Sequence, residues 1–372
     1  MPRDRDAQAG PDRLRRRGGE RGGSSRARPA RGGEVVSVNL PEELADAIRR
    51  MPKVELHHHI EGAAPPAFVR GMAAEKGLNI SNIFDAHGAY DYADFLQFLD
   101  VYEQATKPLT SPEDYGRLTV AVLEEAAKDN VIYLETFISP AFCGGGDVAA
   151  WKEYLHAIRE AAATVPDVTL RGIITAVRHF GPDEAKRAAI CAQETVGSFI
   201  TGFGMGGDEN AGTFRDFTYA YDAAREAGLR LTTHAGEWGG PKVVREAIEV
   251  LKVERIGHGV RSIEDPKLVD YLAASGVVLE VCPQSNVALG VYPSTKAHPI
   301  QKLRKAGVTV TVSTDDPPFF HTTMTREFEE LALAFGWDVD DFRALGITAA
   351  DAAFCDKATR AALKSKLEKF VA

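Results

Sequence analysis

The sequence predicts an α/β fold of the TIM (β/α)8 barrel class, with a helical insertion after the first strand. A length of 372 residues suits such a barrel with insertions. Short β-branched runs alternate with amphipathic stretches, which is typical of parallel βαβ units. Histidine and acidic residues follow several of these runs, and barrels of this class build their active sites at the C-terminal ends of the strands.

Eight runs are expected to form the strands of the barrel. They span residues 54–58, 131–139, 170–177, 199–203, 231–234, 255–258, 277–281 and 308–313. Helices are expected over 214–227, 241–251 and 266–274, which are rich in Ala, Glu, Lys and Arg. The stretch 68–130 looks mostly helical and is long enough to cap the active site. A doubly wound open sheet is the alternative fold, but no Gly-x-Gly-x-x-Gly follows the first run.

The chain begins with a segment of different composition. Residues 1–33 contain ten Arg and four acidic residues, so the net charge of −9 leaves −15 for residues 34–372. We expect 1–33 to be a disordered Arg/Gly-rich tail and 34–372 to be a single metal-dependent barrel domain. The acidic body makes nucleic acid an unlikely partner for the folded domain. Arg-Gly-Gly occurs three times in the tail, which leaves an RNA-associated protein as a remote alternative.

The four cysteines lie far apart in the sequence, and none forms a Cys-x-x-Cys pair. Neither a disulfide framework nor a cysteine zinc site is therefore indicated. No apolar run approaches the ~18 residues that a membrane helix needs. The Arg-rich start has no apolar segment behind it, unlike a secretory signal. We expect a cytoplasmic protein with a small-molecule substrate, without membrane contact or an obligate protein partner.

Four residues at predicted strand ends form a candidate zinc site. Side chains alternate along a strand, so His57 and His59 point to one side and His58 to the other. His234 ends the fifth run and Asp315 follows the eighth. Imidazole and carboxylate groups suit Zn²⁺, and a catalytic zinc keeps one position for water. The pattern predicts one zinc ion per chain.

Two further carboxylates lie beside this candidate zinc site. Glu237 is three residues beyond His234 and can face the metal without binding it, as a proton shuttle requires. Asp316 follows Asp315 and can face the substrate. A solvated loop acid and a helix cap before Pro317 are the alternative interpretations.

The motifs together resemble the adenosine deaminases of the amidohydrolase superfamily. They read KVELHHH from residue 53, MGGDE from 205, HAGE from 234, RIGHG from 255, CPQSN from 282 and TDDP from 314. They occur in family order, and the likeness extends to about residues 34–372. The resemblance implies that His57, His59, His234 and Asp315 hold zinc.

The resemblance also implies roles around a purine ring. Glu237 would donate a proton to N1, and His258 would orient and help deprotonate the water that the metal activates. Asp316 would share a hydrogen bond at N7, and the backbone N–H of Gly207 would donate to N3. Ser139 also matches the family's substrate-binding pattern.

An apolar helix covers the purine in this family. The residues that match it are Phe95, Leu96 and Leu99. The motif set as a whole predicts zinc-dependent hydrolysis of adenosine, and of 2′-deoxyadenosine, to the inosine product and ammonia.

Glu61 departs from the family pattern, which usually has an Asp that contacts the 5′-hydroxyl of ribose. Glu here is more typical of adenine deaminases and of enzymes that take 5′-modified nucleosides. Ser139-Pro140 replaces an Asp-Pro pattern associated with adenine deaminases, and this favours adenosine. Adenine, a 5′-modified adenosine, or a metal-binding protein without catalysis are the alternatives.

Overall fold

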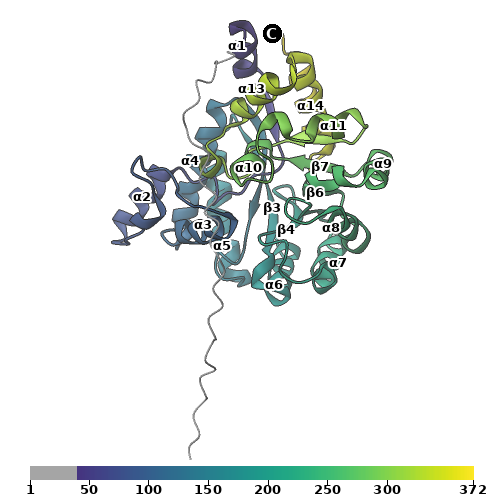
Figure 1. Ribbon diagram of the computed structural model, residues 1–372. Helices are drawn as coiled ribbons and strands as arrows, with labels where there is room; N and C mark the ends of the chain where they lie inside the picture. The colour runs from purple at the N-terminus through teal and green to yellow at the C-terminus, as the bar shows by residue number, and fades with distance from the viewer. Residues whose placement is uncertain (1–39) are drawn as a thin grey trace, which may run out of the picture. The chain divides into compact units, whose positions relative to one another are not determined.

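Residues 40–372 are described by this computed structural model, and within them eight parallel strands form one sheet in chain order (Figure 1). The strands are β1 (Lys53–Glu55), β2 (Val131–Ile138), β3 (Thr169–Val177), β4 (Ile200–Gly206), β5 (Arg230–Ala235), β6 (Arg255–His258), β7 (Val278–Val281) and β8 (Val310–Val312). Helices connect the strands, so the predicted barrel class is confirmed. The predicted tail, and with it the RNA hypothesis, lies outside the described residues.

The two ends of the sheet meet just beyond β1 and β8. The His59 N–H donates to the Asp315 carbonyl at 3.1 Å, and the Asp315 N–H donates to the His57 carbonyl at 3.1 Å. The Ser313 hydroxyl accepts the His57 N–H at 3.1 Å. Closure of the barrel therefore places two segments that are about 250 residues apart in sequence against each other, and both carry predicted zinc ligands.

β1 and β4 differ most from their predicted bounds, each by three residues at the C-terminal end, while the other strands match within two residues. β1 ends at Glu55 because the following residues make only isolated bridges, His58 with Asp315 and His59 with Phe137. β4 continues to Gly206, past the predicted end at 203, because it stays paired with β3 as far as Val177. Pairing with a neighbouring strand thus overrides the low strand propensity of the glycines in β4.

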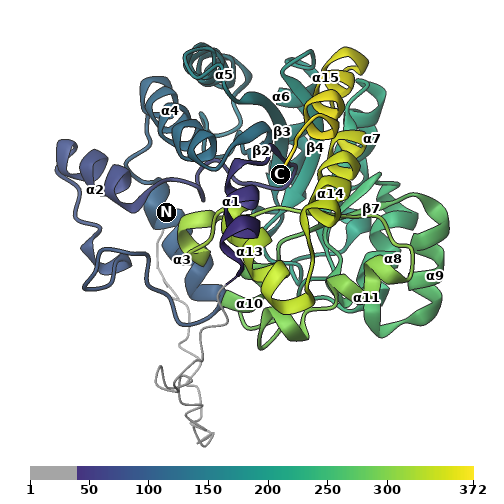
Figure 2. The ribbon, with the colours of Figure 1, turned by 90° about the horizontal axis from the view of Figure 1, so that it is seen from above.

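Most helices lie between strands on the outside of the barrel. They are α1 (Glu42–Arg50), α2 (Pro66–Glu75), α3 (Phe95–Thr106), α4 (Pro112–Lys128), α5 (Val148–Ala163), α6 (Pro182–Gln193), α7 (Thr218–Glu226), α8 (Pro241–Glu246), α9 (Pro266–Ser275), α10 (Pro283–Ala288), α11 (Ile300–Lys305), α12 (Pro317–Phe320), α13 (Met324–Phe335), α14 (Val339–Ala352) and α15 (Lys357–Glu368). Helix α14 contacts both β1 and β8 and packs beside α15 (Figure 2). None of the described helices has the length and apolarity that crossing a bilayer requires.

The insertion between β1 and β2 contains α2, α3 and α4, as the helical prediction for 68–130 required (Figure 1). Asp94 caps α3 by accepting the Gln97 N–H at 3.0 Å. Ser111 and Asp114 form a capping box at the start of α4. These caps satisfy backbone N–H groups that a helix leaves free at its first turn, and they define where α3 and α4 begin.

Candidate active site

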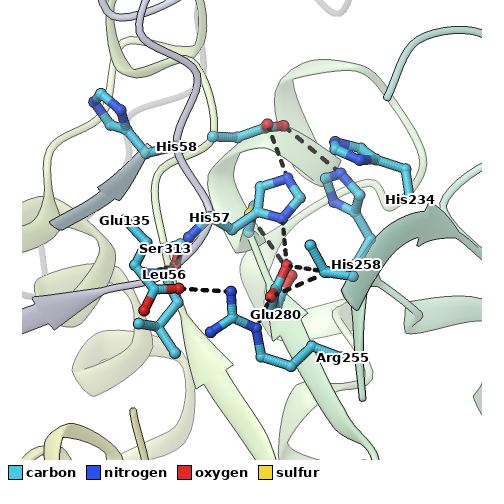
Figure 3. Close-up of polar contacts among 12 residues, drawn as sticks. Leu56, His57, His58, Glu135, His234, Arg255, His258, Glu280 and Ser313 are labelled. Atoms are coloured by element: carbon cyan, nitrogen blue, oxygen red, sulfur yellow. Dashed lines mark hydrogen bonds and ion pairs between the residues drawn. The ribbon is translucent and has the colours of Figure 1, made fainter. Parts of the chain in front are cut away.

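The four predicted zinc ligands converge at the C-terminal ends of the strands. The Nε2 atoms of His57 and His59 lie 3.3 and 3.2 Å from Asp315 Oδ1. His59 Nε2 also lies 3.2 Å from His234 Nε2. The four residues, from three distant parts of the chain, are thus linked by short contacts. The group whose donor atoms all lie within 4.8 Å of one another is His57, His234, His258 and Asp315, while His59 groups with Asp315 and Asp316. His58 points away, as alternation predicts, and its Nδ1 lies 2.9 Å from the Thr136 hydroxyl (Figure 3).

Three of the candidate ligands also form hydrogen bonds within the barrel through the atom that does not face the other ligands. His57 Nδ1 lies 2.9 Å from Glu280 Oε2, and His234 Nδ1 lies 2.9 Å from the Met205 carbonyl. The Ser285 hydroxyl donates to Asp315 Oδ2 at 2.7 Å. Because Nδ1 donates in both histidines, each Nε2 presents its lone pair to the shared point.

A buried charge network lies beneath His57. Arg255 Nε forms an ion pair with Glu280, and Arg255 Nη2 donates to Glu135 Oε2 at 2.7 Å. Figure 3 shows Arg255 between the two carboxylates, with His57 on the opposite side of Glu280. All three charged side chains are buried. The network therefore fixes the carboxylate that orients His57 without requiring contact with solvent.

These residues fit a divalent metal ion. His57 Nε2 is buried and has no hydrogen bond of good geometry within residues 40–372, which suits a lone pair meant for a metal. Burial lowers the pKa of His57, but Asp315 and Glu280 outweigh this and raise it to about 9. The carboxylates around His57 therefore stabilise a positive charge at its position. Three imidazoles and one carboxylate are the donors that zinc takes in catalytic sites.

Two residues of the site have unusual backbone conformations. His258 has φ of 62° and Asp315 has φ of 66°, in the left-handed region that non-glycine residues rarely adopt. Strain of this kind is typical of functional sites. Between β5 and β7, Gly257 lets His57 approach the backbone, since a Cβ there would lie 2.6 Å from His57 Cε1.

Glu237 faces the same point from the loop after β5 and does not bind the cluster. Its Oε1 accepts a hydrogen bond from Asn286 Nδ2 at 2.9 Å. Burial, then the nearby Asp315 and Glu209 charges, raise the pKa of Glu237 well above its ordinary value. A carboxyl kept protonated in this way can donate a proton near neutral pH.

Glu209 holds the loop that carries Glu237. Its carboxylate accepts backbone N–H groups from Gly236, Glu237 and Gly239 at 2.9–3.0 Å. The MGGDE motif contains this residue, although the sequence alone gave no reason to assign it a role. Charge-assisted hydrogen bonds to consecutive N–H groups fix the loop conformation, so Glu209 determines where the Glu237 side chain begins.

A pocket opens over this cluster, and its empty space measures about 740 Å³ with the open mouth included. Of the predicted site residues, those that line it are His59, Glu61, Phe95, Leu99, Ser139, Gly207, His234, Glu237, His258, Asp315 and Asp316. His57 lies beneath the lining, fully buried.

Leu96 is the predicted substrate-binding residue that the structure does not bring to the pocket. Its side chain is 67% exposed, and Phe98 lines the pocket in addition to Phe95 and Leu99. The reason is helical spacing, since positions three and four apart share a face and Leu96 lies one residue after Phe95. The face of α3 toward the pocket continues through Tyr102.

Two predicted substrate contacts expose unpaired polar atoms to the pocket. Ser139 Oγ and Asp316 Oδ1 are buried and lack hydrogen-bond partners among residues 40–372. Burial, with the nearby Asp315 charge, raises the pKa of Asp316 well above its ordinary value. Buried polar atoms without partners cost free energy, so both atoms are suited to bind a polar ligand.

Glu61 is clamped by two phenols of the helical insertion, one from α3 and one from α4. Tyr102 Oη donates to Oε2 at 3.1 Å, and Tyr115 Oη donates to Oε1 at 3.0 Å. Glu61 is 3% exposed, and burial raises its pKa to about 7. Neither tyrosine was identified from the sequence, because 41 and 54 residues separate them from Glu61.

Two other supporting residues were missed by sequence reasoning. Glu280 is an acidic residue inside the apolar run 277–281, and such a buried charge is itself a sign of a functional contact. Asn286 belongs to the CPQSN motif, but its contacts with Glu237 and His258 appear only in the structure.

Comparisons with known proteins agree with this geometry. A family model described as adenosine deaminase matches residues 52–370. A protein from Rhizobium rhizogenes named adenine deaminase is 46% identical over 85% of this chain and 99% of its own length. One from Rhizobium meliloti with the same name is 41% identical over 85% of this chain and 98% of its own.

Solved structures show the same architecture. The crystal structure of an adenine deaminase from Arthrobacter aurescens has a TM-score of 0.78 and 30% identity, covering 86% of this chain and 98% of that one. A zinc-bound amidohydrolase from Burkholderia ambifaria has a TM-score of 0.79 and 26% identity, covering 90% and 94%. These similarities extend over the barrel and its insertion.

The relatives correct one prediction made from the sequence. Adenosine was the expected substrate, and Ser139-Pro140 was the feature that favoured it. Relatives at 41–46% identity are instead named for adenine, so the prediction of adenosine is wrong. The Glu61 departure, which pointed to adenine, was the more informative of the two features.

Proposed function

This chain belongs to the adenosine deaminase family of hydrolytic deaminases, and we propose that it hydrolyses adenine to hypoxanthine and ammonia with one zinc ion. The observation that carries the proposal is Glu61, a buried carboxylate in the pocket that two tyrosines hold in place. The substrate named for the relatives in the same family agrees with it.

The position of Glu61 favours a free base over a nucleoside. Its neighbour Gly62 lies against Asp316, since a Cβ on Gly62 would meet the Asp316 carboxylate. Glu61 and Asp316 both line the pocket. Adenine has an N–H on its imidazole ring, whereas adenosine carries ribose at that nitrogen. A fixed acceptor suits the N–H, and the two phenols leave it little freedom to move aside for a sugar.

Three groups besides Glu61 would hold the purine in the pocket, and His258 would act on the water. Glu237 donates a proton to N1, which makes C6 attackable. The Gly207 N–H donates to N3 and Asp316 bonds N7, so C6 faces the point between the metal ligands. His258 lies beside that point, with its Nε2 3.8 Å from Asp315 Oδ2, and orients the attacking water.

His57, His59, His234 and Asp315 would hold the zinc ion. Zinc in such a site lowers the pKa of water from 15.7 toward about 7 and so supplies a nucleophile near neutral pH. In the net reaction, the oxygen of water bonds to C6 and the bond from C6 to the amino nitrogen breaks. One proton of the water stays on the purine, and the other converts the leaving amino group to ammonia.

The proposal is tested by assaying zinc-loaded protein with adenine. Hypoxanthine and ammonia should form in equal amounts. Glu237→Gln keeps the shape but carries no proton, so kcat should fall by about 10²–10⁴-fold at normal zinc content. Asp315→Ala should lose activity and zinc together. Turnover that survives complete metal removal, or a loss below about tenfold in Glu237→Gln, would overturn the mechanism.

A further inference from the structure

A buried polar chain connects the start of α11 to the two groups beside the metal ligands. His298 Nε2 lies 3.1 Å from Asn286 Oδ1. Asn286 Nδ2 lies 2.9 Å from Glu237 Oε1 and 3.3 Å from His258 Nδ1. His298 and Asn286 are 2% and 0% exposed, and neither lines the pocket.

A backbone group determines the direction of every bond in this chain. The Ile300 N–H donates to His298 Nδ1 at 3.2 Å. A backbone N–H can only donate, so His298 Nδ1 holds a lone pair and the ring proton lies on Nε2. Burial lowers the pKa of His298 to about 3, which keeps the ring neutral. His298 therefore donates to Asn286, whose Oδ1 must be the atom that faces it.

The donor and acceptor roles fixed at His298 also determine those of Asn286 and of the two residues it contacts in the active site. With Oδ1 facing His298, the amide directs both its hydrogens toward Glu237 and His258. His258 Nδ1 accepts one of them, so the proton of a neutral His258 ring lies on Nε2, which faces Asp315. Glu237 Oε1 accepts the other, which leaves Oε2 as the oxygen that carries the transferable proton.

We infer that His298 and Asn286 are positioning residues that fix which nitrogen of His258 and which oxygen of Glu237 carry a proton. The inference rests on the proposed function for its catalytic consequence, but the tautomer itself does not depend on turnover. With the proton on Nε2, His258 donates to the attacking water and orients it, but it does not take up the proton of the water as the resemblance implied. The opposite tautomer would turn a lone pair toward the water instead. Such changes of tautomer cost activity without loss of structure.

A matched pair of variants separates this role from simple packing, since His298 also packs against the Tyr292 ring at 5.1 Å. His298→Phe keeps an aromatic ring but loses the donor, and we expect kcat to fall by about tenfold or more with KM and zinc content unchanged, a part of the 10²–10⁴-fold that acid–base groups supply. His298→Gln places an amide N–H near the position of Nε2 and should recover most of kcat. If His298→Phe retains wild-type kcat, or if both variants lose it equally, the inference is wrong.

The tautomer is measured directly by nitrogen-15 NMR of the zinc-loaded protein labelled at histidine, with the His258 resonances assigned from His258→Gln. Wild type should show the Nε2–H form of His258. Asn286→Asp offers only acceptors, so it should shift His258 toward Nδ1–H. An Nδ1–H form in wild type would overturn the inference, as would no change in Asn286→Asp. If wild type fails to deaminate adenine while the expected tautomer is present and shifts, the proposed function fails and the inference about the tautomer stands.

Discussion

Glu280 orients a candidate metal ligand from beneath the site. It accepts the His57 Nδ1–H at 2.9 Å and is itself bonded by Arg255 and by the Thr232 hydroxyl. A carboxylate behind a metal-bound histidine fixes the ring and makes its free nitrogen a better ligand. Glu280 thus holds His57 through a strong hydrogen bond, although Glu280 itself does not contact the substrate.

Glu280→Gln should weaken zinc binding. The neutral amide still accepts from His57, but the bond loses its charge, and partners of this kind are worth about 10–100-fold in metal affinity. The measurement is a competition titration with a chelator. Glu254→Gln is the matched control, because this glutamate on the same barrel is exposed and pairs with Arg230 at the surface. Equal zinc affinity in both variants would contradict the role given to Glu280.

Only some of the residues that meet in the candidate site could be predicted from the sequence. His57, His59, His234 and Asp315 could be named from the sequence, because parallel strands of a barrel end at one face and alternate side chains share a direction. Glu280 and Asn286 could not, since their contacts depend on strand register and on side-chain rotamers. The substrate could not be fixed either, because the clamp on Glu61 comes from tyrosines in separate helices.

At the scale of elements, α3 forms the apolar wall of the pocket through one face. Phe95, Phe98, Leu99 and Tyr102 line the cavity at spacings of three and four residues. The sequence predicted a helical cap correctly, since 68–130 is helical in pattern. It did not fix the rotation of α3, because apolar residues also occur on the exposed side, as at Leu96.

The face of α3 is tested by two leucines on the same helix. Leu99→Ala removes apolar carbons from the pocket wall, at about 0.8 kcal/mol for each fully buried CH₂. Leu99 is half-buried, so we expect a loss of about 1 kcal/mol, or roughly fivefold in kcat/KM, mostly through KM. Leu96→Ala should leave both constants at wild-type values. A larger effect at Leu96 than at Leu99 would place the wrong face toward the substrate.

Strand ends were less predictable than strand existence. All eight predicted strands occur, but β1 is shorter and β4 longer than the sequence indicated. The ladder between β3 and β4 continues to Gly206 through pairing that local propensity does not show. This extension matters for the site, because Gly207 then follows directly and lines the pocket.

At the scale of the whole molecule, several buried carboxyls make stability depend on pH. Glu184, in the first turn of α6, is 4% exposed and accepts the Val177 N–H at 3.0 Å at the end of β3. Burial raises its pKa from 4.5 to about 7. The folded protein therefore binds this proton more tightly than the unfolded chain does, and the stability it contributes is lost as pH rises from about 4.5 through 7.

Glu184→Gln should remove this loss, because the amide stays neutral and still accepts the Val177 N–H. We expect the variant to match wild type near pH 4 and to exceed it by up to about 3 kcal/mol near pH 8, seen as a higher Tm in thermal unfolding. Glu194→Gln, directly after the same helix, is the control, since Glu194 is exposed and pairs with Lys152. An equal gain at both pH values would show that the Glu184 carboxyl is not the cause.

Closure of the barrel brings the parts of the site together. The seam between β1 and β8 carries three of the four candidate ligands, and the insertion that follows β1 supplies the two tyrosines that hold Glu61. The central claim is that this clamp selects the free base. The direct measurement compares kcat/KM for adenine and adenosine with the same zinc-loaded protein. A hydrogen bond to a charged acceptor is worth about 1.5–3 kcal/mol, so adenine should be preferred by roughly tenfold or more. Adenosine turned over as well as adenine, or better, would contradict the account.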